Sequence, residues 1–228
     1  MIRTFYYIFF ILLLIGCEKR KLTYKTIAAP LKVEIPKIKG SRFFATLFPI
    51  QSKQDADTYL EQMRKEYYDA THNCYARRCG VQANQDLFWN RTLSPKLQRS
   101  SDDWEPANTA WKPILSVITG EEVFDILVVI TRYFWGTLLW VGGLIQAYTQ
   151  TTKAWLEAIE PVYKPIETEL QLSYTYDQLS SAQYLFDKYE CKIAQEHYSD
   201  LIQQKILVNL WYLEALKKEL TDRQLTFL

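Results

Sequence analysis

The stretch SDDWEPANTAWKPILSVITGEEVFDILVVITRYFWGTLLWVGGLIQAY, residues 101–148, decides the fold. At its centre, residues 126–130 form an apolar run that is too short to cross a membrane and too rich in β-branched residues for a helix. We therefore predict a buried strand over residues 125–134. An acidic loop precedes this strand, and Gly136, Gly142 and Gly143 follow it within ten residues. Polar and glycine-rich loops at the ends of buried strands are where functional sites are usually built.

Charge is distributed unevenly along the chain. The 228 residues carry a net charge of +1 and are 48% hydrophobic, enough for a proper core. Residues 18–78 hold 13 Lys/Arg against 7 Asp/Glu, which gives +6. Residues 156–228 hold 7 against 12, which gives −5. An anionic partner would therefore meet only the first lobe, although ordinary solvated faces explain the same charges.

The first 160 residues are predicted to mix strands and helices around the buried strand. Ser52 is the expected N-cap of a helix that continues to about Tyr68, with Ala56, Leu60 and Met63 on its apolar face. Residues 82–106 are polar and lack periodicity, so they are predicted to form a long loop. The other predicted elements are strands over 32–39 (interrupted by Pro36), 42–48 and 72–78, and helices over 113–118 and 144–159.

The last part of the chain is predicted to be a small unit of its own. A half-buried strand over 167–176 is followed by a helix capped by Asp177. Two strands over 191–198 and 203–210, a helix over 212–220 and a last strand within 223–228 complete it. The order β-α-β-β-α-β is that of a ferredoxin-like domain. We therefore expect a domain over residues 24–160 and a ferredoxin-like domain over 161–228.

The first 17 residues have two interpretations. Residues 5–15 form an apolar run of signal-peptide length, and Leu14-Ile15-Gly16-Cys17 fits a bacterial lipobox with a lipidated Cys17. A membrane-anchored lipoprotein is one interpretation. A start codon assigned too far upstream is the other, because the folded region is predicted to begin within about ten residues of Cys17.

Five motifs in fixed order resemble the YigZ/IMPACT family. They are Asp69-Ala70-Thr71-His72-Asn73-Cys74, Ser101-Asp102-Asp103-x-Glu105-Pro106, Thr109-Ala110, Arg132-Tyr133-Phe134-x-Gly136 and Gly142-Gly143-Leu144. The resemblance extends from about Tyr24 to the C-terminus. It implies an α+β protein of two domains, with lobes similar to domains IV and V of elongation factor G. It also implies a cytoplasmic protein that, like IMPACT-type proteins, acts in control of translation through a partner protein. We expect no cofactor.

The sequence departs from the family at four tryptophans. Trp104, Trp111, Trp135 and Trp140 stand where the family has glycine. Each replacement would overfill a turn or demand an unfavourable φ, and Gly, at 7 of 228 residues, is as rare as Trp. We interpret these tryptophans as UGA codons that the organism reads as glycine. The alternative is a divergent homologue with genuine tryptophans, and the same question stays open for Trp89, Trp155 and Trp211.

The residue types for catalysis are present but not in a specific arrangement. His72, Asp102, Asp103 and Glu105 could together form an acid/base or metal site in a hydrolase-like enzyme. The sequence does not show that the acidic loop meets His72, and the carboxylates could instead hold loop amides or pair with Arg132. No P-loop, Rossmann or G-x-S-x-G motif is present. We predict no metal and assign no catalytic residue.

A binding site is the favoured interpretation. Arg132 and Tyr133 leave the central strand together and could offer a cation and an aromatic face to RNA. Arg42, with Arg77 and Arg78, would extend a basic face for phosphates. The other candidates are Asn73, Thr109, Gly136 and the Gly142-Gly143 helix start, whose free N–H groups suit an anion. We therefore predict a protein that binds RNA or a ribosome-associated partner, with no chemistry of its own.

Overall fold

The structure is a computed structural model that describes residues 22–85, 91–158 and 160–227. The described residues fold into two compact units, the first from Tyr24 to Lys164 and the second from Pro165 to Phe227 together with Leu22 and Thr23. Both mix helices and strands, so the predicted α+β class is confirmed. Residues 1–17, with Cys17, and Trp89 lie outside the described residues. No described helix is both long enough and apolar enough to cross a bilayer.

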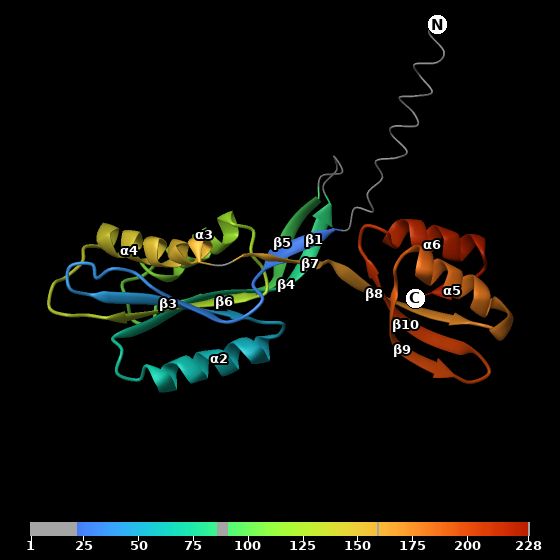
Figure 1. Ribbon diagram of the computed structural model, residues 1–228, viewed down its shortest axis with the longest axis horizontal. Helices are drawn as coiled ribbons and strands as arrows, with labels where there is room; N and C mark the ends of the chain where they lie inside the picture. Colours follow the sequence, from blue (N-terminus) through green and yellow to red (C-terminus); the bar gives the residue numbers. More distant parts are fainter. Residues whose placement is uncertain (1–21, 86–90, 159, 228) are drawn as a thin grey trace, which may run out of the picture. The chain divides into compact units, whose positions relative to one another are not determined.

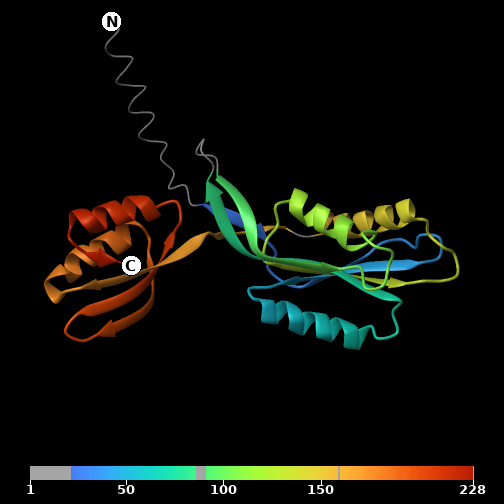
Figure 2. The same cartoon turned by 180° about the vertical axis from the view of Figure 1, so that it is seen from behind.

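The first unit is built on a five-stranded antiparallel sheet in the order β2-β3-β6-β4-β5. Helix α2 lies on one side of this sheet, and α3 and α4 lie on the other (Figures 1 and 2). A separate two-stranded sheet pairs β1 with β7. The elements are β1 (Thr23–Thr26), β2 (Leu31–Glu34), β3 (Arg42–Pro49), α2 (Lys53–Glu66), β4 (His72–Gln85), β5 (Arg91–Ser101), α3 (Trp111–Gly120), β6 (Ile126–Tyr133), α4 (Val141–Lys153), the 3-10 turn η1 (Ala154–Glu157) and β7 (Val162–Pro165).

Strand β6 is the centre of this unit, as its sequence predicted. Ile126, Val128 and Ile130 pack into the core beneath α3 and α4, whereas Leu127 and Val129 pack into the core beneath α2. Both faces of the strand are therefore buried, which explains why its sequence is continuously apolar rather than alternating.

Helix α2 begins where the sequence placed its N-cap. The Ser52 hydroxyl accepts from the Asp55 backbone N–H at 3.1 Å, and the Asp55 carboxylate accepts from the Ser52 N–H at 3.0 Å. This reciprocal capping box satisfies two of the N–H groups that a helix start leaves unpaired. Ala56, Leu60 and Met63 are buried against the sheet, as predicted.

The prediction of a long loop over residues 82–106 is wrong for most of its length. Strand β4 continues to Gln85, and β5 pairs with it from Arg91 to Ser101. Beyond Arg78, β4 no longer pairs with β6. After Cys79 none of the described residues of the hairpin is fully buried, so no buried face imposes an apolar alternation on it. Side-chain bonds hold it instead, such as Gln82 Nε2 to Ser94 Oγ at 3.0 Å.

The second unit has the predicted element order β-α-β-β-α-β. Its sheet has the strand order β11-β8-β10-β9. Thr175, rather than Asp177, makes the capping interaction, with Gln178 as its partner, because a short 3-10 turn precedes the helix. The elements are β8 (Glu167–Tyr174), η2 (Tyr176–Gln178), α5 (Leu179–Lys188), β9 (Lys192–Tyr198), β10 (Ile202–Asn209), α6 (Leu213–Asp222) and β11 (Thr226–Phe227).

Candidate functional site

Three of the five motifs meet where β4 begins, β6 ends and the loop of residues 102–110 folds back over these strand ends. Asp102 organises this loop. Its Oδ1 accepts from the backbone N–H groups of Ala110 and Trp111 at 3.0 Å each, and its Oδ2 accepts from the Asn108 N–H at 2.7 Å. One carboxylate thus satisfies donors at the start of α3 and closes the loop beneath it.

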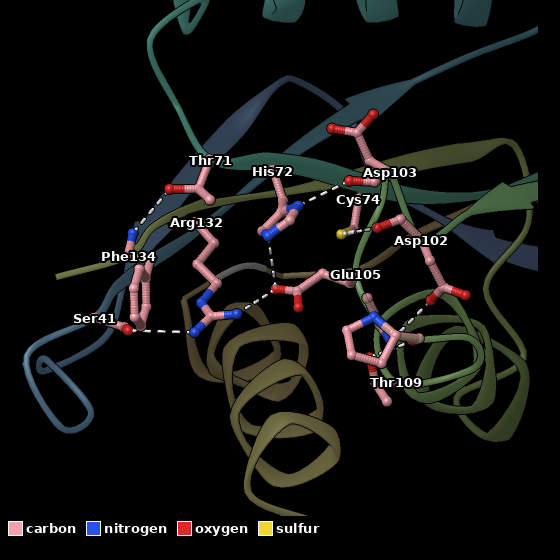
Figure 3. A network of polar contacts seen from close by, with 12 residues as sticks. Ser41, Thr71, His72, Cys74, Asp102, Asp103, Glu105, Thr109, Arg132 and Phe134 are labelled. Carbon is pink, nitrogen blue, oxygen red and sulfur yellow. Dashed lines mark hydrogen bonds and ion pairs between the residues drawn. The ribbon is translucent and has the colours of Figure 1, made fainter. Parts of the chain in front are cut away.

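Asp103 and His72 fasten this loop to the start of β4 (Figure 3). The Asp103 Oδ2 accepts from the Asn73 N–H at 2.6 Å, and His72 Nδ1 lies 2.8 Å from the Asp103 carbonyl oxygen. A carbonyl oxygen can only accept, so Nδ1 is the protonated nitrogen in this contact. The acidic loop therefore meets His72, which the sequence could not show.

Glu105 is the buried centre of the network. Arg132 Nη1 lies 2.5 Å from Glu105 Oε1, and the Tyr148 hydroxyl donates to the same oxygen at 2.8 Å. His72 Nε2 lies 3.7 Å from it. Tyr148, from α4, was not identified from the sequence, because a tyrosine on the apolar face of a helix is indistinguishable from a core residue. Burial raises the pKa of the Tyr148 hydroxyl well above its usual value, so it stays a donor at neutral pH.

Cys74 is part of the packing of the same network. Its thiol donates to the Asp102 carbonyl oxygen at 2.9 Å and lies 3.3 Å from the Tyr148 hydroxyl. Burial raises its pKa. Nucleophilic cysteines need a lowered pKa and access to solvent, and Cys74 is fully buried. It is therefore a core residue and not a nucleophile.

The candidate catalytic residues are thus brought together, but their polar atoms are used to hold the loop. Among the described residues, no group of three or more His, Cys, Asp or Glu side chains is arranged to hold a metal ion. Arg132 and Tyr148 donate to Glu105 and would compete with a metal for its carboxylate oxygen. The geometry indicates a structural network that joins the loop of residues 102–110 to the sheet.

Several predicted binding residues are buried within the fold. Arg132 was expected to offer its charge to a ligand, but its guanidinium is paired with Glu105 and packed against the Phe43 and Phe134 rings. Arg77 is buried beside Asp57, and Arg78 donates to the Ile118 and Val123 carbonyl oxygens. The expectation that Arg77, Arg78 and Arg132 form a basic face is wrong, because all three are buried and their guanidinium groups bond to acceptors of the fold.

Asn73 and Thr109 are also engaged within the fold. The Asn73 amide oxygen accepts from the Thr131 hydroxyl at 2.8 Å, and its amide nitrogen donates to the Tyr67 carbonyl oxygen at 3.3 Å. The buried Thr109 hydroxyl donates to the Pro106 carbonyl oxygen at 2.6 Å. Neither side chain is free to bind a ligand without first breaking one of these bonds.

Arg42 and Tyr133, in contrast, lie on an aromatic and basic surface on the α2 side of the sheet. Lys32 Nζ lies 4.3 Å from the centre of the Phe44 ring and 4.9 Å from that of Tyr67, and it donates to the Tyr67 hydroxyl at 2.8 Å. The Phe44 and Tyr133 rings are stacked, with centres 6.5 Å apart. We call this set of residues the aromatic–basic surface: Lys32, Arg42, Tyr67 and Tyr133 around the buried Phe44.

Two comparisons identify the family. Residues 39–156, 118 of the 228, match the Impact N-terminal domain. An IMPACT family member of Haemophilus influenzae is 33% identical over 187 residues, which cover 82% of this chain and 85% of the relative. The chain belongs to the IMPACT family. IMPACT family member YigZ of Escherichia coli is 33% identical over 78% of the chain and 82% of YigZ. This chain is also similar to a protein described as a hypothetical protein, whose crystal structure is 29% identical in sequence. The match covers 92% of this chain and 97% of that protein's chain, with a TM-score of 0.66.

The four unusual tryptophans of this IMPACT family chain do not plug the site. The residues Trp104, Trp135 and Trp140 are 95%, 69% and 85% exposed, and Trp111 is half-buried at the first position of α3. The expectation that these tryptophans overfill their turns is therefore wrong. Trp104 does carry a φ of +69°, a left-handed conformation that glycine adopts without strain. Gly136 has a similar φ of +76°, whereas Trp140 lies at −65°.

Proposed function

We propose that this IMPACT family protein binds single-stranded RNA and thereby acts in the control of translation, without catalysing a reaction. The observation that carries the proposal is the aromatic–basic surface. It combines cations with partly exposed tyrosine rings, and single-stranded nucleic acids are bound by this combination of phosphate attraction and base stacking. The family's role in translation, which the motif resemblance implies, supports the same function.

The electrostatics of the surface favour an anion. Arg42 forms a two-pronged pair with Glu34, with distances of 2.5 and 2.8 Å, and this bond lowers the pKa of the Glu34 carboxyl. Lys32 and Lys37 lower it further. Three cations thus surround one carboxylate, which leaves a local excess of positive charge for phosphate groups.

The network around Glu105 supports binding over catalysis. A general base must reach a substrate proton, yet Asp102 and Asp103 accept from backbone N–H groups and Glu105 accepts from Arg132 and Tyr148. We therefore rank a metal-dependent hydrolase that uses His72 and these carboxylates below the RNA-binding function. It predicts a stoichiometric divalent metal that is lost in Asp103→Ala.

The finer assignments that follow from the resemblance are proposals as well. We assign the second unit to the ferredoxin-like class, because its element order and its strand order β11-β8-β10-β9 match that class. We compare the two units with domains IV and V of elongation factor G, and we place the protein in the cytoplasm. Fractionating cells that express the native gene tests the location, since a lipidated Cys17 would instead leave the protein in the membrane fraction.

The binding proposal is tested by titrating fluorescein-labelled oligouridylate with the protein over a salt series. For single strands, the slope of log K against log salt is about −0.7 for each phosphate contact. We expect a measurable negative slope for the wild type, reduced by about 0.7 in Lys32→Ala and again in the double variant with Lys37→Ala. Lys218→Ala, an exposed lysine of the second unit, should leave both affinity and slope unchanged. A flat salt dependence, or an equal loss in the control, would refute the proposal.

A further inference from the structure

A groove runs between α3 and α4 on the side of the sheet opposite the aromatic–basic surface. Its volume is about 700 Å³. Lys112, Pro113, Ser116 and Val117 line it from α3. From α4 it is lined by residues one turn apart: Val141, Ile145, Thr149 and Lys153. At 1.5 Å per residue, the α4 wall is about 18 Å long, the length of a helix of about three turns.

The groove is apolar at its base and continues into an exposed apolar segment. Pro113 and Val117 are buried along α3. Val141 and Ile145 are exposed on α4, as is Leu138 in the loop that precedes it. Adjacent exposed apolar side chains on a folded domain mark surfaces that bind another molecule. This argument does not depend on whether positions 135 and 140 are tryptophan or glycine.

The charges that line the groove are not balanced within the chain. Glu121 is paired with Lys25 at 3.1 Å. Lys112 and Lys153 are both exposed, and among the described residues neither forms an ion pair. Glu121, the one carboxylate that the described residues place in the lining, is therefore neutralised, whereas two ammonium groups are available to a partner.

We propose that this groove binds an acidic amphipathic helix of a partner protein. The apolar face of such a helix would lie on Val117, Val141 and Ile145, and its carboxylates would meet Lys112 and Lys153. Helices bind grooves of this kind through apolar anchors spaced one turn apart, and flanking charges select the partner and its orientation. The proposal is independent of the RNA-binding function, because it uses neither the aromatic–basic surface nor the Glu105 network.

The test uses the full chain and two stapled helical peptides of about 14 residues, which is enough to span the groove. Both carry leucine on one face, and the remaining positions are glutamate and alanine in one peptide and lysine and alanine in the other. We expect fluorescence anisotropy to show that the glutamate peptide binds at least tenfold more tightly. Ile145→Glu should abolish this binding, and Lys218→Glu should not change it.

Charge reversal gives the decisive comparison. The double variant Lys112→Glu/Lys153→Glu should lose the glutamate peptide and gain the lysine peptide, because only the sign of the groove charge changes. Both lysines are exposed, so the variant is expected to fold, which circular dichroism checks. Four outcomes would overturn the proposal: equal binding of both peptides, no effect of charge reversal, binding to anionic lipid vesicles that Ile145→Glu removes, or self-association that the same variant removes.

Discussion

The guanidinium of Arg132 and the carboxylate of Glu105 form an ion pair at 2.5 Å with side chains only 5% and 2% exposed. This pair joins the end of β6 to the loop of residues 102–110. Removing one partner of a buried pair leaves the other charge without compensation, which costs about 3–5 kcal/mol. We therefore expect this pair to hold the loop of residues 102–110 against the sheet.

Replacing Glu105 by Gln keeps the size of the side chain and removes its charge. We expect the free energy of unfolding to fall by about 3 kcal/mol, measured by urea denaturation. Glu34→Gln is the matched control, because its pair with Arg42 is about 40% exposed on both sides and should contribute at most about 1 kcal/mol. Equal losses in the two variants would show that burial does not determine the cost.

Removing the Asp102 carboxylate should release three backbone N–H groups at once. Asp102→Ala is expected to lower the free energy of unfolding by about 2 kcal/mol and to speed amide hydrogen exchange at Asn108, Ala110 and Trp111. Asp102→Asn keeps one acceptor oxygen and should recover part of the loss. Unchanged exchange at these three amides would contradict the capping role.

The unusual tryptophans can be tested by replacing them with glycine and by identifying the natural residues. If its left-handed φ strains the chain, Trp104→Gly should increase the free energy of unfolding by about 1 kcal/mol. Trp140→Gly should give no such gain, since φ there is −65°. Codon reading and peptide mass spectrometry at positions 104, 111, 135 and 140 decide the natural residues directly. UGG codons with tryptophan peptides would contradict the recoding hypothesis.

Tyr133 should respond to alkaline pH. Burial, followed by its bond to Asp69, raises the pKa of Tyr133 to about 12. The folded state keeps this proton where the unfolded state, with a pKa near 10, has lost it. The stability that results is complete below pH 10 and is lost as the pH rises through about 12. An ultraviolet titration against Tyr133→Phe should locate this pKa, and Asp69→Asn should lower it. No change in Asp69→Asn would contradict the assignment.

Chelation distinguishes a structural network from a metal site. Because the Asp102, Asp103 and Glu105 carboxylates are already bonded to protein donors, EDTA should leave the melting temperature unchanged. Metal analysis of the purified protein, with Asp103→Ala as comparison, is the accompanying measurement. A stoichiometric metal whose removal lowers the melting temperature would favour the hydrolase alternative.

Local sequence determined much of the fold. The run of residues 126–130 predicted a buried central strand, and Ser52 predicted the start of α2. The spacing of apolar residues predicted the first strand and the first helix of the second unit. Each of these signals acts between neighbours in the chain, through capping bonds or through side chains that share a face. The β4–β5 hairpin was missed because its polar outer part has no buried face to leave a pattern.

Only the tertiary structure decided which polar residues reach the surface. Arg42 and Arg132 look equivalent in sequence, yet Arg42 is partly exposed beside Lys32 and Arg132 is buried on Glu105, 27 residues away. The difference arises because the loop of residues 102–110 folds back and brings the Asp103 carboxylate to β4 and the Glu105 carboxylate to β6. The burial of a charge depends on partners distant in sequence, so residue type and local spacing could not determine it.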